Sequence, residues 1–476
     1  MASASDPTPL RSLSNIELFS STRHSLGIYR SVVITCRYHA PPSSPLDQEL
    51  FYSALCTIVS AQPMLRVGIL DAEDRHACFS HVGRIDLRHH VAFSPLDVPA
   101  HSQTQSALND SIQTAIATVQ GQHHDRLWHD IATTPPWRIH VLLHPSPLTY
   151  DVVFAFHHAL MDGTSGRLFH QQLLAALDAK HPPSSPILDF AQPPALPLGQ
   201  DAAIPSRSSI SFLVQSMWKE FAPLCLQTTT PTWSGIPIDF SLPYHTCILP
   251  VTIPAHVLAS LLSACRTNGT SLTALLHALV LSSLALNLPH PYAFAASTPI
   301  NLRPYLSTPT PHTLRSLVSG ASHLFPQDSV LSFRQASQRD NLVWHHARLI
   351  KSQLTDKLKT LPNDDATTLL HYIRNWPAFW SRKDGQPRTD AWEVSNIGPI
   401  EQTATSWRIS NVVFSNGSMV AGPALGINVA TVAHGPCIAT ISWQRGVVPH
   451  DLPLSLARDL ASYTQCFYKT QAFFDP

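Results

Sequence analysis

The sequence lacks an excess of charge of either sign. Lys plus Arg and Asp plus Glu number 31 each among 476 residues, and charged residues make up only 13% of the chain. A protein that attracts nucleic acid or an anionic membrane through its overall field is therefore not expected. Hydrophobic residues make up 44% of the chain, which indicates a folded protein with a large core rather than a disordered one.

Metal-ligand spacings and a secretory signal are also missing. The N-terminus, MASASDPTPLRSLSNIELF, lacks the basic start and the apolar run of a signal peptide. The cysteines are scattered without a CxxC pair, so we expect buried free thiols and no bound metal. They are Cys36, Cys56, Cys78, Cys225, Cys247, Cys265, Cys437 and Cys466. These features favour the reducing cytoplasm.

No apolar run reaches the length of a membrane span. Residues 272–288 come nearest, but they fall short of the usual ~20 residues and include Thr273 and His277. We expect this segment to form a buried core helix, capped within residues 268–271.

The chain is longer than one compact core usually allows, so we expect two lobes. Residues 180–205 are rich in proline, which is incompatible with a helix or a central strand, and they are predicted to form a long connection between the two halves. The expected organisation is an N-terminal lobe over residues 1–190, a crossover connection over 191–245 and a C-terminal lobe over 246–476.

Hydrophobic periodicity predicts a mixed α/β protein. Strands are predicted at residues 28–38, 137–143, 150–156, 246–253, 292–300, 407–414, 426–433 and 437–444. Helices are predicted at residues 45–59, 165–179, 254–266 and 271–288.

Four His-His pairs occur, at residues 89–90, 123–124, 157–158 and 345–346, and only the third is followed by xxxDG. That motif follows the strand predicted at 150–156, and reactive side chains are commonly held where a rigid strand meets a loop. The other three pairs are better explained as structural histidines. Zinc binding by His124 and His129 is a minor alternative.

The histidine motif suits proton transfer from an alcohol. A neutral imidazole can remove the proton that makes an alcohol a poor nucleophile. Successive strand residues face opposite ways, so we assign His158 as the general base and His157 a supporting packing or hydrogen-bonding role. Asp162 either orients the imidazole or holds the loop through a buried ion pair, and the spacing leaves both open.

Motifs for competing chemistries are absent from the sequence. It contains no GxSxG elbow for a serine nucleophile, no P-loop and no GxGxxG. Direct transfer is therefore favoured over a covalent enzyme intermediate, and phosphoryl transfer and dinucleotide chemistry are disfavoured.

The segment HHALMDG resembles the HHxxxDG signature of the CoA-dependent acyltransferase superfamily, which includes chloramphenicol acetyltransferase, the plant BAHD acyltransferases and nonribosomal peptide condensation domains. Three further segments look like the fungal alcohol acetyltransferase family: SNIELFSSTRHSLGIYRSVVITCRY, STPINLRPYL and EVSNIG. They span nearly the whole chain in the expected order. The DFGWG element of the BAHD branch is absent.

This resemblance implies an α/β fold of two chloramphenicol-acetyltransferase-like lobes with mixed sheets and a central solvent tunnel. It implies that Asp162, the second catalytic candidate of the motif, pairs with Arg303 of INLRP to shape the site. Gly163 would leave room beside the base. Ser395 and Asn396 of SNIG are possible oxyanion or tunnel residues, although a turn explains them equally well.

The predicted activity is transfer of an acetyl or other short acyl group from CoA to a small-molecule hydroxyl, in fungal secondary metabolism. The expected partners are acetyl-CoA, or another acyl-CoA, and an alcohol. No bound cofactor, metal, nucleic acid or membrane span is expected, and we expect a monomer. Two alternatives stay open: a condensation-type enzyme that takes its acyl group from a carrier protein, and a protein of the same fold that catalyses a rearrangement or a cyclisation.

Overall fold

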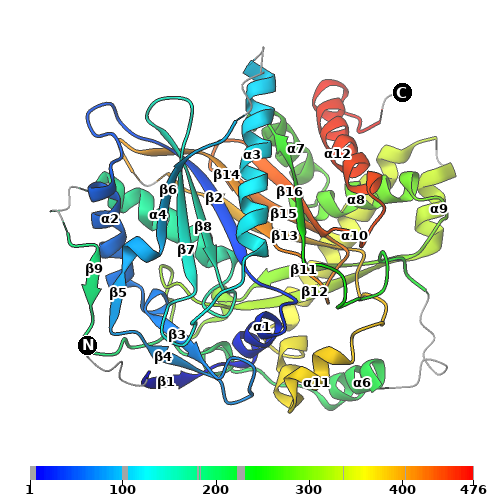
Figure 1. Cartoon of the computed structure of the whole chain (residues 1–476). Coiled ribbons are helices and arrows are strands. Elements are labelled where there is room, and N and C mark those ends of the chain that lie inside the picture. The colour runs from blue at the N-terminus through cyan, green and yellow to red at the C-terminus, as the bar shows by residue number, and fades with distance from the viewer. Residues whose placement is uncertain are drawn as a thin grey trace.

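Two mixed β-sheets form the centre of the protein (Figure 1). The structure is a computed structural model that describes residues 7–98, 105–179, 182, 184–221, 231–335, 337–402 and 404–474. The predicted α/β class with mixed sheets is confirmed, because each sheet contains both parallel and antiparallel neighbours.

The first sheet has five strands in the order β14-β2-β8-β7-β6. Their bounds are β2 (Val32–His39), β6 (Val91–Pro95), β7 (Trp137–Leu143), β8 (Thr149–Phe156) and β14 (Arg408–Asn416). The central strand β8 is buried at every residue, as expected for a β-rich apolar segment that is covered on both faces.

The second sheet has six strands in the order β10-β16-β15-β13-β11-β12. Their bounds are β10 (Thr246–Ile253), β11 (Phe294–Asn301), β12 (Val318–Phe325), β13 (Trp392–Ile400), β15 (Leu425–Val432) and β16 (Cys437–Gln444). Two small sheets complete the strands, with β1 (Pro9–Ser12), β3 (Val67–Leu70), β4 (Cys78–His81), β5 (Arg84–Asp86) and β9 (Ile187–Asp189).

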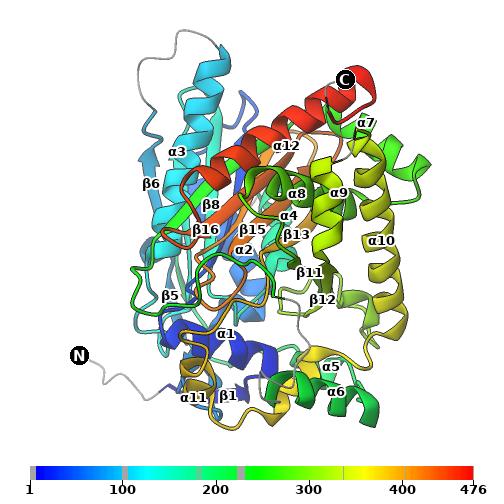
Figure 2. The same ribbon diagram turned by 90° about the vertical axis from the view of Figure 1, so that its right-hand side faces the viewer.

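Helices cover the outer faces of both sheets (Figures 1 and 2). Around the first sheet and the base of the molecule lie α1 (Asn15–Ser25), α2 (Gln48–Ala61), α3 (Gln105–Asp125), α4 (Gly163–Asp178), α5 (Gln200–Ala203), α6 (Ile210–Phe221) and α11 (Trp376–Ser381). Around the second sheet lie α7 (Ala255–Thr267), α8 (Leu272–Asn287), α9 (Gln327–Gln335), α10 (Arg339–Thr360) and α12 (Asp451–Thr470). Each sheet carries its own large apolar cluster.

One strand crosses between the two halves of the chain. β14 follows β13 in sequence, yet it pairs antiparallel with β2 in the first sheet, with Val412 opposite Cys36. The assignment of residues 1–190, 191–245 and 246–476 to two lobes and a connection stays a prediction, with β14 reaching from the third range into the first sheet.

Most of the predicted strands and helices are present with small shifts of their ends. Strands β7, β10 and β16 have the predicted bounds. The strand predicted at 28–38 begins only at Val32, because the amides of Ile28 and Tyr29 both bond to the carbonyl of Arg23 and close a turn after α1.

The proline-rich segment 180–205 is less irregular than predicted. It contains the short strand β9, which pairs with β5 at an edge, and the one-turn helix α5. Both are short enough to lie between prolines, and β9 has a single neighbouring strand, so the missing proline donors cost little.

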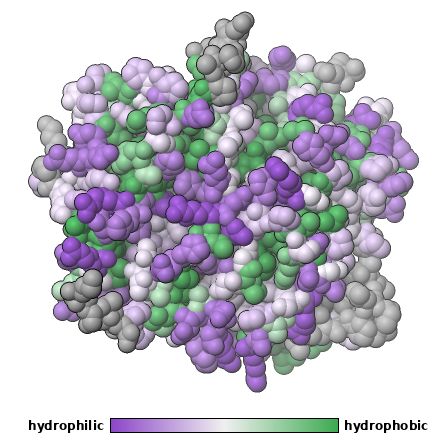
Figure 3. Space-filling view, in the orientation of Figure 1, coloured by the Kyte–Doolittle hydropathy of each residue, from purple (hydrophilic) through white to green (hydrophobic). Residues whose placement is uncertain are grey.

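The apolar segment at 272–288 is confirmed as the buried helix α8, which Ser271 caps. Among the described residues no single helix is long and apolar enough to span a membrane; α7 and α8 reach that composition only together, and they are bent by 99°. On the face seen in Figure 3, hydrophilic and hydrophobic residues are interspersed.

The cysteine prediction holds in part. The seven described cysteines are free. Four of them are buried, but Cys78, Cys247 and Cys466 are partly exposed. Cys78 is the first residue of β4, Cys247 lies on the edge strand β10, and Cys466 lies on α12. Cys225 lies outside the described residues.

Candidate active site

His158 lies where β8 ends and α4 begins. The amide of His157 bonds to the carbonyl of Pro136, and the amide of Leu160 bonds to the carbonyl of His157. Asp162 then caps α4, because its Oδ1 accepts from the amide of Ser165 at 2.8 Å. These bonds hold the motif as a fixed turn between a buried strand and a helix.

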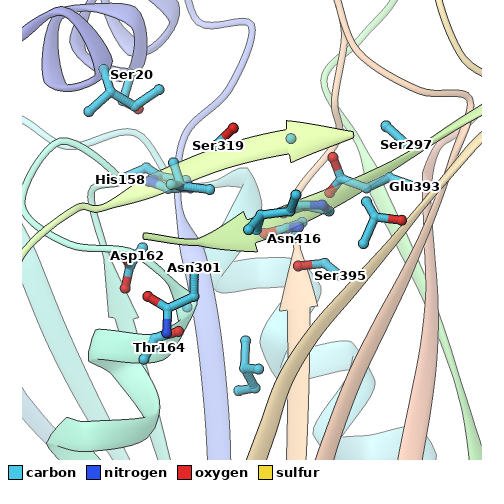
Figure 4. Close-up of a pocket in the computed structure, with 18 of the residues that line it drawn as sticks. Ser20, His158, Asp162, Thr164, Ser297, Asn301, Ser319, Glu393, Ser395 and Asn416 are labelled. Atoms are coloured by element: carbon cyan, nitrogen blue, oxygen red, sulfur yellow. The ribbon is translucent and has the colours of Figure 1, made fainter. Parts of the chain in front are cut away.

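His158 lines a cavity between the two sheets (Figure 4). The wall is built from α1, the turn after β8, the start of α4, and strands β11, β12, β13 and β14. Figure 4 shows Glu393 and Ser395 of β13 across the cavity from His158. Residues far apart in sequence therefore face one cavity, as in most small-molecule sites.

The imidazole of His158 is neutral at neutral pH. Burial lowers its pKa to about 4, and the nearby charge of Arg23 lowers it further, against smaller opposing effects of its own main-chain carbonyl and of Asp162. Its Nδ1 atom is buried while the ring lines the cavity. Nε2 is thus the ring nitrogen that a ligand can reach, and in the neutral ring it can accept a proton.

Asp162 forms the ion pair that the resemblance implied. Its Oδ2 lies 2.8 Å from Nη1 of Arg303, and its Oδ1 lies 3.0 Å from Nη2. Oδ2 also accepts from the amide of Leu317 at 2.9 Å. Burial opposes ionisation, but the charge and hydrogen bonds of Arg303 outweigh it and hold the Asp162 pKa below its usual value.

The carboxylate of Asp162 is therefore committed to the protein framework. It joins α4 to Arg303 and Leu317, which flank β11 and β12 of the second sheet. In Figure 4 it points away from His158. The pairing of Asp162 with Arg303 is thus confirmed.

Replacing Arg303 with alanine should lower the free energy of unfolding by about 3 to 5 kcal/mol, because it leaves a buried carboxylate without its counter-charge. The side chains of Arg303 and Asp162 are only 11% and 8% exposed. Urea unfolding would measure the change. As a control, Arg84→Ala removes the partner of Asp189 in a pair that is 67% and 68% exposed, and it should cost less than about 1 kcal/mol. Equal stability of Arg303→Ala and the unaltered protein would contradict this role.

His157 is fully buried and packs behind the motif. Its Nδ1 accepts from the amide of Ala159 at 3.0 Å, and its ring centroid lies 4.7 Å from that of His24. Burial, together with the neighbouring His24, His158 and Arg23, lowers its pKa well below the usual value. These contacts are the packing and hydrogen bonding that the sequence suggested for it.

Gly163 is required by close packing rather than by open space. A Cβ atom at this position would lie 2.7 Å from Cγ2 of Ile397 on β13. The space that the sequence led us to expect beside the base is occupied by Ile397, which brings the start of α4 against the second sheet.

The SNIG segment is part of strand β13 and not a free turn. Its pairing with β15 shifts register between Asn396 and Pro399, and Gly398 takes φ +75° there, a conformation that favours glycine. The Asn396 amide is used locally, since it donates to Thr273 and accepts from the amide of Gly398. Ser395 lines the cavity with its side chain facing inward (Figure 4).

The other His-His pairs have structural contacts. His90 stacks on Trp137 with ring centroids 4.2 Å apart, and His346 stacks on Phe333 at 5.6 Å. Nε2 of His124 lies 2.8 Å from Oγ of Ser415. Within the described ranges no group of three or more His, Cys, Asp or Glu side chains has the arrangement of a metal site.

Two charged residues of the cavity were missed by sequence reasoning. Arg23 comes from α1 and Glu393 from β13. Glu393 could have been noticed, because it is a charged residue between the apolar Trp392 and Val394 of a strand; Arg23 gives no comparable signal, since charged residues are common on helices.

Sequence comparison assigns the chain to a family. The model of the family described as alcohol acetyltransferase matches residues 111–451. A probable alcohol acetyltransferase of Fusarium pseudograminearum, FCK4, is 26% identical over 479 aligned positions, covering 95% of this chain and 94% of that protein. A second one, crmB of Aspergillus fumigatus, is 25% identical and covers 91% of this chain and 94% of that protein.

Solved structures share the fold. TRI3 trichothecene 15-O-acetyltransferase from Fusarium sporotrichioides has a TM-score of 0.66 at 14% identity, with 96% of this chain and 95% of that chain covered. The condensation domain of the monacolin K polyketide synthase MokA has a TM-score of 0.58 at 10% identity, with 98% and 99% covered. The two-lobed fold is therefore confirmed, and the family match over more than half of the sequence shows that the chain belongs to the alcohol acetyltransferase family.

Proposed function

We propose that this protein transfers an acetyl or other short acyl group from CoA to a hydroxyl of a small molecule, with His158 as the general base. The observation that carries the proposal is the buried neutral imidazole of His158 lining a cavity between the two sheets. Arg303 neutralises the nearby Asp162, so His158 is left as the proton acceptor. The family membership supports acyl transfer.

The proposed reaction needs one base and no covalent enzyme intermediate. Nε2 of His158 removes the alcohol proton while the alcohol oxygen attacks the thioester carbonyl. The carbon–oxygen bond forms, the carbon–sulfur bond then breaks, and the proton on His158 passes to the CoA thiolate. General base catalysis of this kind typically contributes about 100- to 10,000-fold.

Other residues would support this chemistry. The hydroxyl of Ser395 faces the cavity and is a candidate donor to the oxyanion of the tetrahedral intermediate, a role worth about 100- to 1,000-fold in known enzymes. We assign Arg303, His157 and Gly163 to the framework, and Asn396 to the bulge of β13. We further propose that the cavity belongs to a tunnel that admits the two substrates from opposite sides.

The donor and the reaction can be tested together. Purified protein would be incubated with acetyl-CoA and a panel of alcohols, with thiol release and product mass as readouts. We expect thiol release that depends on the alcohol, and a product that carries one added acetyl group. If acetyl-CoA is inert while an acetylated pantetheinyl carrier protein supports ester formation, the donor is a carrier. A rearranged or cyclised product without acyl transfer would refute the proposal.

The pH dependence of turnover tests the state of His158. Because its pKa is lowered to about 4, the ring is already deprotonated at mildly acidic pH, and the base is active only in that form. At saturating substrates we expect kcat to change less than about twofold between about pH 5.5 and pH 8. A fall of kcat with a midpoint near about pH 6.5, in protein that circular dichroism shows to be folded, would contradict the lowered pKa of His158 as the catalytic base.

A further inference from the structure

Two opposite charges face the cavity without pairing. Arg23 and Glu393 both line it, and each influences the pKa of the other through its charge. Neither takes part in any of the ion pairs found among the described residues. They are thus near enough to interact and too far apart to be in contact.

The guanidinium of Arg23 is held rigidly. Its carbon lies 4.2 Å from the ring centroid of Phe19 and 4.5 Å from that of Tyr29. Its Nε donates to the carbonyl of Phe19 at 3.2 Å. These contacts use two aromatic rings and Nε, and no hydrogen bond of the two terminal nitrogens is found among the described residues, so both can donate to a ligand.

Glu393 presents a carboxyl group to the same space. It lies on β13 beside Ser297 of β11, its partner in the parallel pairing, and Figure 4 shows it across the cavity from His158. Burial and the charge of Asp390 raise its pKa to about 7, against the charge of Arg23. No hydrogen bond to its side-chain oxygens is found among the described residues, so the carboxyl group is a free and strong acceptor for a ligand hydroxyl.

The base adjoins this pair of charges. The ring centroid of His158 lies 5.9 Å from that of Tyr29, and Tyr29 is the ring on which Arg23 stacks. An alcohol whose reacting hydroxyl meets His158 therefore lies near Arg23, and Glu393 faces it across the cavity.

We propose that Arg23 and Glu393 form an acceptor subsite for a second hydroxyl of the alcohol, which donates to Glu393 and accepts from Arg23. A cationic group would be repelled by Arg23 and an anionic one by Glu393, whereas a hydroxyl is both donor and acceptor and satisfies both. The preferred acceptor is then a neutral diol or polyol that is acetylated at one position. This inference rests on the proposed function for the identity of the ligand as the acceptor.

The test compares two alcohols that differ by one hydroxyl, cis-1,2-cyclohexanediol and cyclohexanol. Calorimetry without acetyl-CoA would measure their affinities, so the result does not depend on turnover. Cyclohexanol is the more apolar and would bind better in a purely apolar cavity. We expect the diol to bind about 10-fold more tightly, because hydrogen bonds to charged groups are strong.

Single-residue variants test whether Glu393 and Arg23 cause the tighter binding of the diol. Glu393→Gln is expected to weaken diol binding about 5- to 10-fold and to leave cyclohexanol within about twofold, because it removes the charge at nearly constant shape. Arg23→Met should also lower the preference for the diol. Glu401→Gln makes the same chemical change in an exposed residue just after β13 and should leave both affinities unaltered. Melting temperatures would identify variants that are misfolded.

The outcomes separate this subsite from the proposed reaction. If the diol preference and its loss in Glu393→Gln are found, also in a His158→Ala background, the subsite stands even where acyl transfer fails. Equal affinities for the two alcohols, binding of neither, or an equal loss for both in Glu393→Gln would overturn it. So would a Glu393→Gln variant that weakens acetyl-CoA binding and spares the diol.

Discussion

Replacing His158 with alanine is expected to lower kcat by about 100- to 10,000-fold, the contribution typical of a general base. The neutral imidazole lines the cavity, and the neighbouring carboxylate of Asp162 already accepts from Arg303 and Leu317, so Asp162 is not free to take over the proton. Thiol release from acetyl-CoA in the presence of an accepted alcohol would measure the loss.

A second His-His pair supplies the matched control. His345 is exposed on α10 beside the buried His346, and His345→Ala should leave kcat within about twofold, because surface substitutions away from a site rarely matter. The two variants should melt at similar temperatures. Equal turnover by His158→Ala and the unaltered protein would show that His158 is not the general base.

Acidification is expected to lower the free energy of unfolding progressively below about pH 6.5. Burial lowers the pKa of His158 and His170 to about 4, and that of His124 to about 3. These rings stay neutral in the folded protein, whereas the unfolded chain binds protons below about pH 6.5. The unfolded state therefore takes up more protons in this window, and stability falls as the pH falls.

The expected size of this effect is large. One pKa unit corresponds to about 1.4 kcal/mol, so each of these rings contributes on the order of 3 kcal/mol. The stabilisation is complete above about pH 6.5 and is lost progressively towards the folded-state values. Three such groups together approach the whole stability of about 5 to 15 kcal/mol of a typical protein.

Urea unfolding at several pH values would measure the number of protons taken up. His170 lies between Tyr38 and the carbonyl of Ile34, and His170→Gln should make the pH dependence shallower by about 1.4 kcal/mol per pH unit. His312→Gln, at an exposed position, should leave the slope unaltered. Constant stability between about pH 7.5 and pH 5.5 would show that the buried rings do not control acid unfolding.

Local sequence patterns predicted the elements that carry the motif. Strand β8 is apolar throughout and α4 has helical periodicity, so the turn between them could be placed from sequence with an error of a few residues. The resemblance added the pairing of Asp162 with Arg303, which are 141 residues apart. No periodicity within either segment encodes such a distance.

The sequence was less informative where neighbours decide conformation. SNIG has the composition of a turn, but β15 pairs with it and makes it a bulged strand. Gly163 could be explained by an open space, but Ile397 lies against it. In both cases the deciding contact comes from a segment more than 25 residues away, as the numbering shows.

The sequence by itself determined the family, because HHxxxDG, INLRPYL and SNIG lie in the expected order along the chain and the alcohol acetyltransferase model matches residues 111–451. It also determined the α/β class, because hydrophobic periodicity is a local property. Only the tertiary structure decided which side chains face His158. Arg23 and Glu393 reach the cavity from α1 and β13, and their charge and burial depend on the packing of two sheets, which no local pattern records.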